Sequence, residues 1–192
     1  MLGQTLSAFL GEESPKLIKI NLATLTLSAF ENDQLIKKYE LAGTGNPKNS
    51  PTPQGDFRIF QKKEKVLSSL SHVWMPWSLR FYKGYYIHGV PYFPSGQLVK
   101  SRYSLGCIRL LTTDAQDLYQ WASLGTKVEI YSEVKLIKKE GDGNYKVYRV
   151  DDNVKQWIKT PAAFERLGYS WQQIDQVNAQ EFDAYQLGAE IE

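Results

Sequence analysis

The chain has 192 residues, of which 42% are apolar, 23% are charged and 13% are aromatic. These values are those of a globular protein, and the length suffices for one domain with a hydrophobic core and a small second module. The net charge of +2 divides into +5 over residues 1–132, with 15 Lys and Arg against 10 Asp and Glu, and −3 over residues 133–192, with 8 against 11. Neither part is basic enough to indicate a nucleic-acid partner, and no apolar run is long enough to form a transmembrane segment.

The first elements along the chain are predicted to be strands. Residues 16–42 alternate apolar and polar side chains on both sides of a polar turn at residues 31–33, which indicates a β-hairpin. Residues 43–55 are rich in Gly, Pro, Asn and Ser and predict a long loop. We expect a strand over residues 56–60, followed by polar, irregular chain over residues 61–73.

The next elements surround the residues of chemical interest. Residues 85–87 predict a short strand that runs into His88. Residues 113–121 predict a helix, because their apolar side chains recur at helical spacing, and residues 127–131 predict a closing strand. We therefore expect a mainly β domain over residues 1–132, with largely antiparallel strands packed like a sandwich and this helix on one side.

A second, smaller unit is predicted over residues 133–192, where the charge balance changes. Residues 134–150 predict a hairpin with a Gly-rich turn, and residues 161–167 predict a short helix with proline at its first position. Two more helical pieces are expected near residues 171–177 and 179–185. Together these elements predict a small α+β module.

The only cysteine, Cys107, ends the segment Ser104-Leu105-Gly106-Cys107. A lone cysteine is more often a small buried residue than a nucleophile, so its surroundings decide. The small residues before it predict a tight turn whose backbone N–H groups converge near the sulfur, where they would stabilise an oxyanion and lower the pKa of the thiol. His88 ends a predicted strand upstream, and the carbonyl of Gly89 is placed to hold its imidazole in one tautomer. The pattern favours a Cys–His pair for nucleophilic catalysis.

Four segments follow one another in a characteristic order. They are Ser50–Phe57, Trp74–Trp77, Ile87–Gly89, and Ser104–Cys107, the last beginning after a spacer of fifteen residues from His88. This order and spacing resemble the signature of the L,D-transpeptidase (YkuD-like) family over residues 16–131. One departure is Leu105, where many members carry a second histidine, and it puts in doubt a helper role for a second imidazole.

The resemblance implies a mechanism on the peptide stems of peptidoglycan. Cys107 would attack the carbonyl of an L-configured residue in a tetrapeptide stem and release D-Ala, and His88 would take the thiol proton. Gly89 and Gly106 complete the expected catalytic set, and carbapenems would acylate the same thiol. Hydrolysis by the same pair, as an L,D-carboxypeptidase or crosslink-cleaving enzyme, is the alternative function, and a non-catalytic wall-binding module is the third. No cofactor is expected.

Further residues are expected to bind substrate. Arg109 would pair with a substrate carboxylate or brace the cysteine turn, and these two roles are equally favoured. The complete expected set is Arg109, Ser104, Leu105, Tyr86 and Trp77, although aromatic residues such as Tyr86 and Trp77 are more often packing residues than walls of a binding site. The other histidine, His72, lies in a polar stretch and is expected to be exposed. The sequence holds no cluster of Cys and His that would predict a metal site.

The second unit resembles a short module that recurs in bacterial cell-surface proteins. The matching residues are Lys155–Ile158, Pro161, Phe164, Gly168–Trp171 and Tyr185. Two roles remain open for it, either a packing appendage or an element that binds the cell wall or gates substrate. Because peptide stems lie outside the cytoplasmic membrane, we expect an extracytoplasmic location in the cell envelope or periplasm. Residues 1–11 lack a charged start and do not predict a signal peptide, so the export signal is expected to be absent from this chain.

Overall fold

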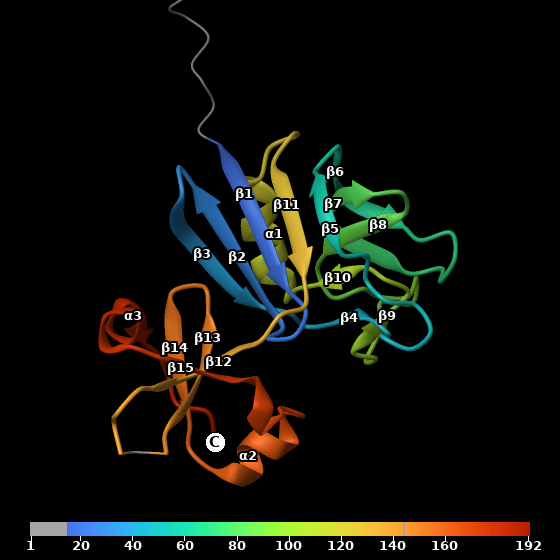
Figure 1. Ribbon diagram of the computed structural model, residues 1–192. Helices are drawn as coiled ribbons and strands as arrows, with labels where there is room; N and C mark the ends of the chain where they lie inside the picture. Colours follow the sequence, from blue (N-terminus) through green and yellow to red (C-terminus); the bar gives the residue numbers. More distant parts are fainter. Residues whose placement is uncertain (1–14, 144) are drawn as a thin grey trace, which may run out of the picture. The chain divides into compact units, whose positions relative to one another are not determined.

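The computed structural model describes residues 15–143 and 145–192, and its contacts divide the chain into two compact units, Met1–Ser132 and Glu133–Glu192. The protein is mainly β, as predicted, with three short α-helices among the described residues (Figure 1). The N-terminal segment that the sequence does not predict to be a signal peptide lies outside the described residues.

The first unit contains a five-stranded sheet. Its strands follow the order β3 (Gln34–Glu40), β2 (Thr26–Glu31), β1 (Lys16–Asn21), β11 (Lys127–Tyr131) and β5 (Gly55–Arg58). The predicted hairpin is confirmed for β2 and β3, which pair antiparallel across the turn at residues 32–33. Its first arm is two strands rather than one, because the chain turns at residues 22–25 and β2 also pairs antiparallel with β1. β1 and β11 pair in parallel, so the two ends of the unit meet in the middle of one sheet.

A four-stranded sheet carries the residues of chemical interest. Its order is β10 (Ile108–Arg109), β8 (Tyr85–His88), β7 (Trp74–Tyr82) and β6 (Gln61–Leu67). The prediction of irregular chain over residues 61–73 is therefore wrong for its first half. β6 is polar because it is an edge strand, and charged side chains on an edge keep it from pairing with another chain.

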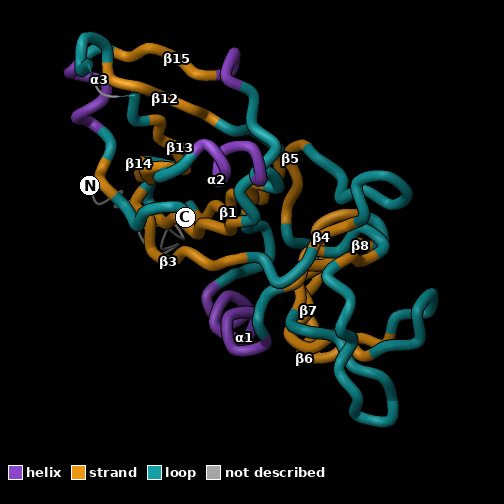
Figure 2. Tube along the Cα trace, turned by 90° about the horizontal axis from the view of Figure 1, so that it is seen from below, coloured by secondary structure: helices purple, strands orange, loops and turns teal. Residues whose placement is uncertain are grey.

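The predicted helix is present as α1 (Thr112–Trp121), and it packs against β7 and β8. Its buried Ala115 and Leu118 join one hydrophobic core with residues of both sheets, such as Ile20 and Leu79. Figure 2 shows that long loops (teal) connect the strands around β4 (Thr44–Gly45), β7 and β8. β4 lies within the predicted loop of residues 43–55 and pairs with β9 (Tyr103–Ser104) just before the cysteine turn.

The second unit is a five-stranded sheet with a helix on each face. The strand order is β15 (Ile174–Val177), β12 (Lys135–Lys139), β13 (Val147–Asp151), β14 (Val154–Ile158) and β16 (Gln186–Leu187). β12 and β13 form the predicted antiparallel hairpin.

The two faces of this sheet have separate cores. Leu136 packs with Phe164 of α2 (Pro161–Arg166), whereas its neighbour Ile137 packs with Phe182 of α3 (Ala179–Ala184). Successive side chains of a strand point to opposite faces, so one strand serves both helices. The prediction of helix over residues 171–177 is wrong after one turn, because a short 3₁₀ helix at Trp171–Gln173 leads directly into β15, which pairs in parallel with β12.

Candidate active site

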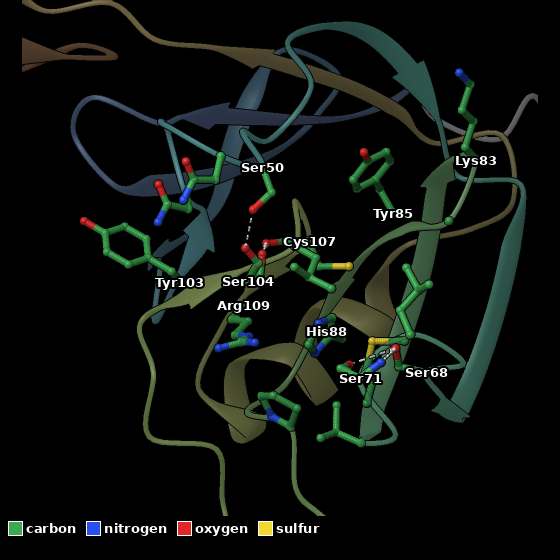
Figure 3. Close-up of a pocket in the computed structure, with 18 residues that line it drawn as sticks. Ser50, Ser68, Ser71, Lys83, Tyr85, His88, Tyr103, Ser104, Cys107 and Arg109 are labelled. Carbon is green, nitrogen blue, oxygen red and sulfur yellow. Dashed lines mark hydrogen bonds between the residues drawn. The ribbon is translucent and has the colours of Figure 1, made fainter.

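Parallel pairing of β8 and β10 brings the cysteine and the histidine together. Arg109 aligns with His88 in this register, and the Leu110 N–H donates to the His88 carbonyl at 2.9 Å. Cys107 immediately precedes β10, so its side chain lies beside the end of β8. Both side chains line one cleft of about 710 Å³ (Figure 3). The number of residues between His88 and Cys107 is thus set by the pairing of β8 with β10 and by the long loop that connects these two strands.

His88 is buried and held in one tautomer. Its Nδ1 lies 2.6 Å from the carbonyl oxygen of Gly89, and the residue is only 2% exposed. A carbonyl oxygen can only accept a hydrogen bond, so Nδ1 carries the proton and Nε2 is left as the basic atom. Burial lowers the pKa of His88 to about 4, the charge of Arg109 adds to this effect, and the hydrogen bond to Gly89 opposes it. The imidazole is therefore neutral near pH 7 and able to accept a proton.

Cys107 does not have the depressed pKa that the sequence predicts. Burial raises the pKa of its thiol, while a hydrogen bond from the Tyr86 backbone and the charge of Arg109 act in the opposite direction and do not offset it. The prediction considered only the nearby donors and omitted the loss of hydration. At rest the cleft accordingly holds a neutral thiol and a neutral imidazole.

The turn before the sulfur is held by the hydroxyl of Ser104. This oxygen accepts a hydrogen bond from the Gly106 N–H at 3.0 Å and donates one to the Cys107 carbonyl at 2.7 Å. Gly106 has φ of +117°, and a Cβ added there would lie 2.7 Å from Cδ1 of Tyr85. Only glycine fits this conformation and this close approach. The Gly106 N–H is therefore engaged inside the turn, an arrangement that the sequence-based expectation of N–H groups converging near the sulfur did not include.

Arg109 lies in the wall of the cleft with part of its hydrogen-bonding capacity unused. Its Nη1 donates to the Ser101 carbonyl at 2.6 Å, whereas its buried Nε has no hydrogen-bond partner. Among the described residues, no carboxylate forms an ion pair with it, and none lines the cleft. A half-buried guanidinium without a carboxylate partner favours an anion as partner.

The remaining expected substrate-binding residues divide into two groups. Ser104 and Leu105 line the cleft, and Leu105 is 57% exposed where the resemblance expected a histidine in many members. Tyr86 and Trp77 do not line it. Tyr86 is 9% exposed and covers the Arg80 guanidinium at 5.6 Å, and Trp77 packs on Tyr119 of α1 with ring centroids 5.5 Å apart. Both are packing residues of the sheet, and that expectation is corrected.

Other cleft residues were not predicted from the sequence. Tyr85 lies against Gly106, and Ser50 donates to the Ser104 carbonyl at 3.2 Å (Figure 3). Ser50 belongs to the Ser50–Phe57 segment that the sequence analysis identified, but no local pattern in the sequence shows that this segment contacts the cysteine turn. His72 is exposed and does not line the cleft. Within residues 15–143 and 145–192, no group of His, Cys, Asp and Glu is arranged to hold a metal ion, and no helix is long and apolar enough to cross a membrane.

A thiol, a neutral imidazole and a guanidinium without a carboxylate partner in one cleft form a set suited to acyl transfer. The family model of the YkuD L,D-transpeptidase catalytic domain matches residues 15–130, and the chain belongs to this family. No curated protein matches the sequence at the level of significance required.

Solved structures agree with this family at the level of the fold. An L,D-transpeptidase from Mycobacterium smegmatis is 21% identical, with 62% of this chain and 59% of that chain covered and a TM-score of 0.53. One from Stackebrandtia nassauensis is 22% identical, with 68% and 62% covered and a TM-score of 0.53. The LD transpeptidase LdtMt1 in complex with imipenem is 20% identical, with 62% and 59% covered and a TM-score of 0.52. The chain therefore spans less than two thirds of each of these chains.

Proposed function

We propose that the protein is a peptidoglycan L,D-transpeptidase that uses Cys107 as nucleophile and His88 as general base. The observation that carries this proposal is the shared cleft, in which a partly buried thiol lies with an imidazole whose free nitrogen is Nε2. Its substrate would be the tetrapeptide stem of peptidoglycan, and its location would be extracytoplasmic. Membership of the family and the fold of the imipenem-bound relative support the same reaction class.

The first half of the reaction forms a thioester. Sγ of Cys107 attacks the carbonyl carbon of the L-configured residue while Nε2 of His88 takes the thiol proton. The C–N bond to D-Ala then breaks, and the imidazolium gives that proton to the leaving amine. Because both groups are neutral at rest, the approach of the carbonyl and the proton transfer occur together rather than from a preformed thiolate.

The second half transfers the acyl group. The amine of another stem attacks the thioester carbonyl, His88 takes one amine proton, and the departing sulfur regains a proton from the imidazolium. Arg109, which lines the cleft, is proposed to hold a stem carboxylate while its Nη1 stays on Ser101. Water in place of the amine would give hydrolysis with the same residues.

The proposal is tested with a disaccharide tetrapeptide and mass spectrometry of the products. We expect a crosslinked dimer that has lost one D-Ala, and we expect none with Cys107→Ala. His88→Ala should slow product formation by ~10²–10⁴-fold, the usual cost of removing a general base, whereas the matched His72→Ala, at an exposed position outside the cleft, should leave the rate unchanged.

Each other product pattern has a definite meaning. A tripeptide without dimer would replace transfer by hydrolysis and leave the pair intact. An unchanged substrate would favour the wall-binding role. If His72→Ala strongly slowed product formation and His88→Ala left the rate unchanged, the assignment of His88 as the base would be wrong.

A further inference from the structure

The second unit has a groove of its own, apart from the catalytic cleft. Its volume is about 490 Å³, within the range of small-molecule sites. The walls come from β13, β14 and the chain from α2 to the 3₁₀ turn, and they include Trp157, Trp171 and Tyr145. No step of the proposed reaction uses these residues.

The aromatic side chains of this groove are more exposed than packing requires. Tyr145 is 98% exposed and Trp171 is 51% exposed. Trp171 stacks on the buried Phe164 with ring centroids 4.1 Å apart and planes 20° apart, so one face of the indole is supported by the core. The capping box between Ser170 and Gln173 fixes the backbone on which it stands. A rigid, half-exposed indole is a costly feature for a surface that binds nothing.

Polar groups line the rim, and they leave little net charge. Lys159 is paired with Glu190 at 3.2 Å and with Glu192 at 2.9 Å. Lys146 lies over the Trp157 ring at 4.2 Å. The unit as a whole carries −3, which disfavours nucleic acid or another polyanion as the ligand.

These features select a neutral ligand with apolar faces and polar edges. A pyranose ring has this shape, because its C–H groups form a flat face that packs on an aromatic ring while its hydroxyl and N-acetyl groups project sideways. Lys146 is placed to donate a hydrogen bond to these projecting groups. The Thr160 hydroxyl accepts a hydrogen bond from the Ala163 N–H, and its own O–H is placed to donate to them as well.

We propose that this groove binds the β-1,4-linked, N-acetylated glycan strand of peptidoglycan, an inference that rests on the proposed function of the first unit. The groove would hold the polymer whose peptide stems the catalytic cleft modifies. Stem peptides fit the groove less well, since its lining residues include no arginine and Lys159 is already paired with Glu190 and Glu192.

The test measures binding of the whole chain to chitotetraose and to chitohexaose, two neutral β-1,4-linked N-acetylated glycans, by isothermal titration calorimetry. We expect both probes to bind to the wild type and to Cys107→Ala alike. Tyr145→Ala and Trp171→Ala should each weaken binding at least about tenfold. Leu187→Ala, which alters an exposed apolar residue of the same unit outside the groove, is the matched control.

Misfolding cannot explain a loss of glycan binding by Tyr145→Ala, because Tyr145 is almost fully exposed and its removal leaves the core untouched. The inference is overturned if the wild type binds neither glycan, if Tyr145→Ala and Trp171→Ala both bind as well as Leu187→Ala, or if the free tetrapeptide or a proline-rich peptide occupies the groove instead. Labelling of Cys107 by imipenem is measured in parallel. Labelling without glycan binding refutes this inference alone, and glycan binding without labelling refutes the proposed function alone.

Discussion

The burial of His88 predicts how stability depends on pH. Its pKa falls from 6.5 to about 4 in the folded protein, so between these values the unfolded chain binds a proton that the folded chain does not. The free energy of unfolding therefore decreases as the pH falls through this window and is unaffected by this group above it. The whole effect is about 3 kcal/mol at pH 4, and about 2 kcal/mol is already lost at pH 5.

The assay is urea unfolding of the wild type and of His88→Asn at several pH values from 8 to 4, at constant ionic strength. Carboxylates also titrate in this range, among them Asp117, whose pKa is lowered by hydrogen bonds from Lys37 and Tyr39. Their contributions are common to both proteins and cancel in the difference. The His88→Asn curve should be flatter by the amount given above, and His72→Asn should follow the wild type. Parallel curves for the wild type and His88→Asn would refute the neutral, buried imidazole.

Two further predictions concern the turn that carries the thiol, and intact-mass spectrometry of imipenem acylation over time measures both. Gly106→Ala should slow acylation by about 10- to 100-fold, because a backbone conformation open only to glycine costs about 1–3 kcal/mol and the new Cβ meets the Tyr85 ring; an unchanged rate would show that the turn tolerates a side chain. Ser104→Ala removes both hydrogen bonds of the hydroxyl and should slow acylation about tenfold, while Ser104→Thr should restore most of the rate. Equal rates for Ser104→Ala and Ser104→Thr would mean that the hydroxyl does not hold the turn.

Patterns that are local in the sequence predicted the fold well. Alternation identified the extended chain of β1 and β2 but not the turn between them, and proline at the first position with Gly168 just past the end identified α2, since these signals arise within a few residues. β6 was missed because an edge strand needs no apolar face to pair with β7. The helix expected after Trp171 was replaced by β15 because pairing with β12, distant in the sequence, outweighs a local helical preference.

In the candidate site too, features set by residues close in the sequence were predicted better than features set by distant neighbours. The spacing predicted that Cys107 and His88 share one site, and both line the same cleft. The Gly89 carbonyl is the partner of the imidazole, as predicted. Tyr86 and Trp77 pack against Arg80 and Tyr119 outside the cleft, and whether an aromatic residue near a motif packs inward or lines a cleft depends on neighbours that the sequence does not reveal.

The protonation states of Cys107 and His88 differ most from what the sequence predicts. A motif reveals which donors stand near the sulfur, and these donors do lower the pKa of the Cys107 thiol. Desolvation depends on every atom packed around the site, and here it exceeds the effect of the donors. The same burial removes the proton from His88, so the two groups are driven toward the neutral pair together. In the proposed mechanism the thiol still holds its proton when a carbonyl enters the cleft, so transfer of that proton to Nε2 of His88 would belong to the attack itself.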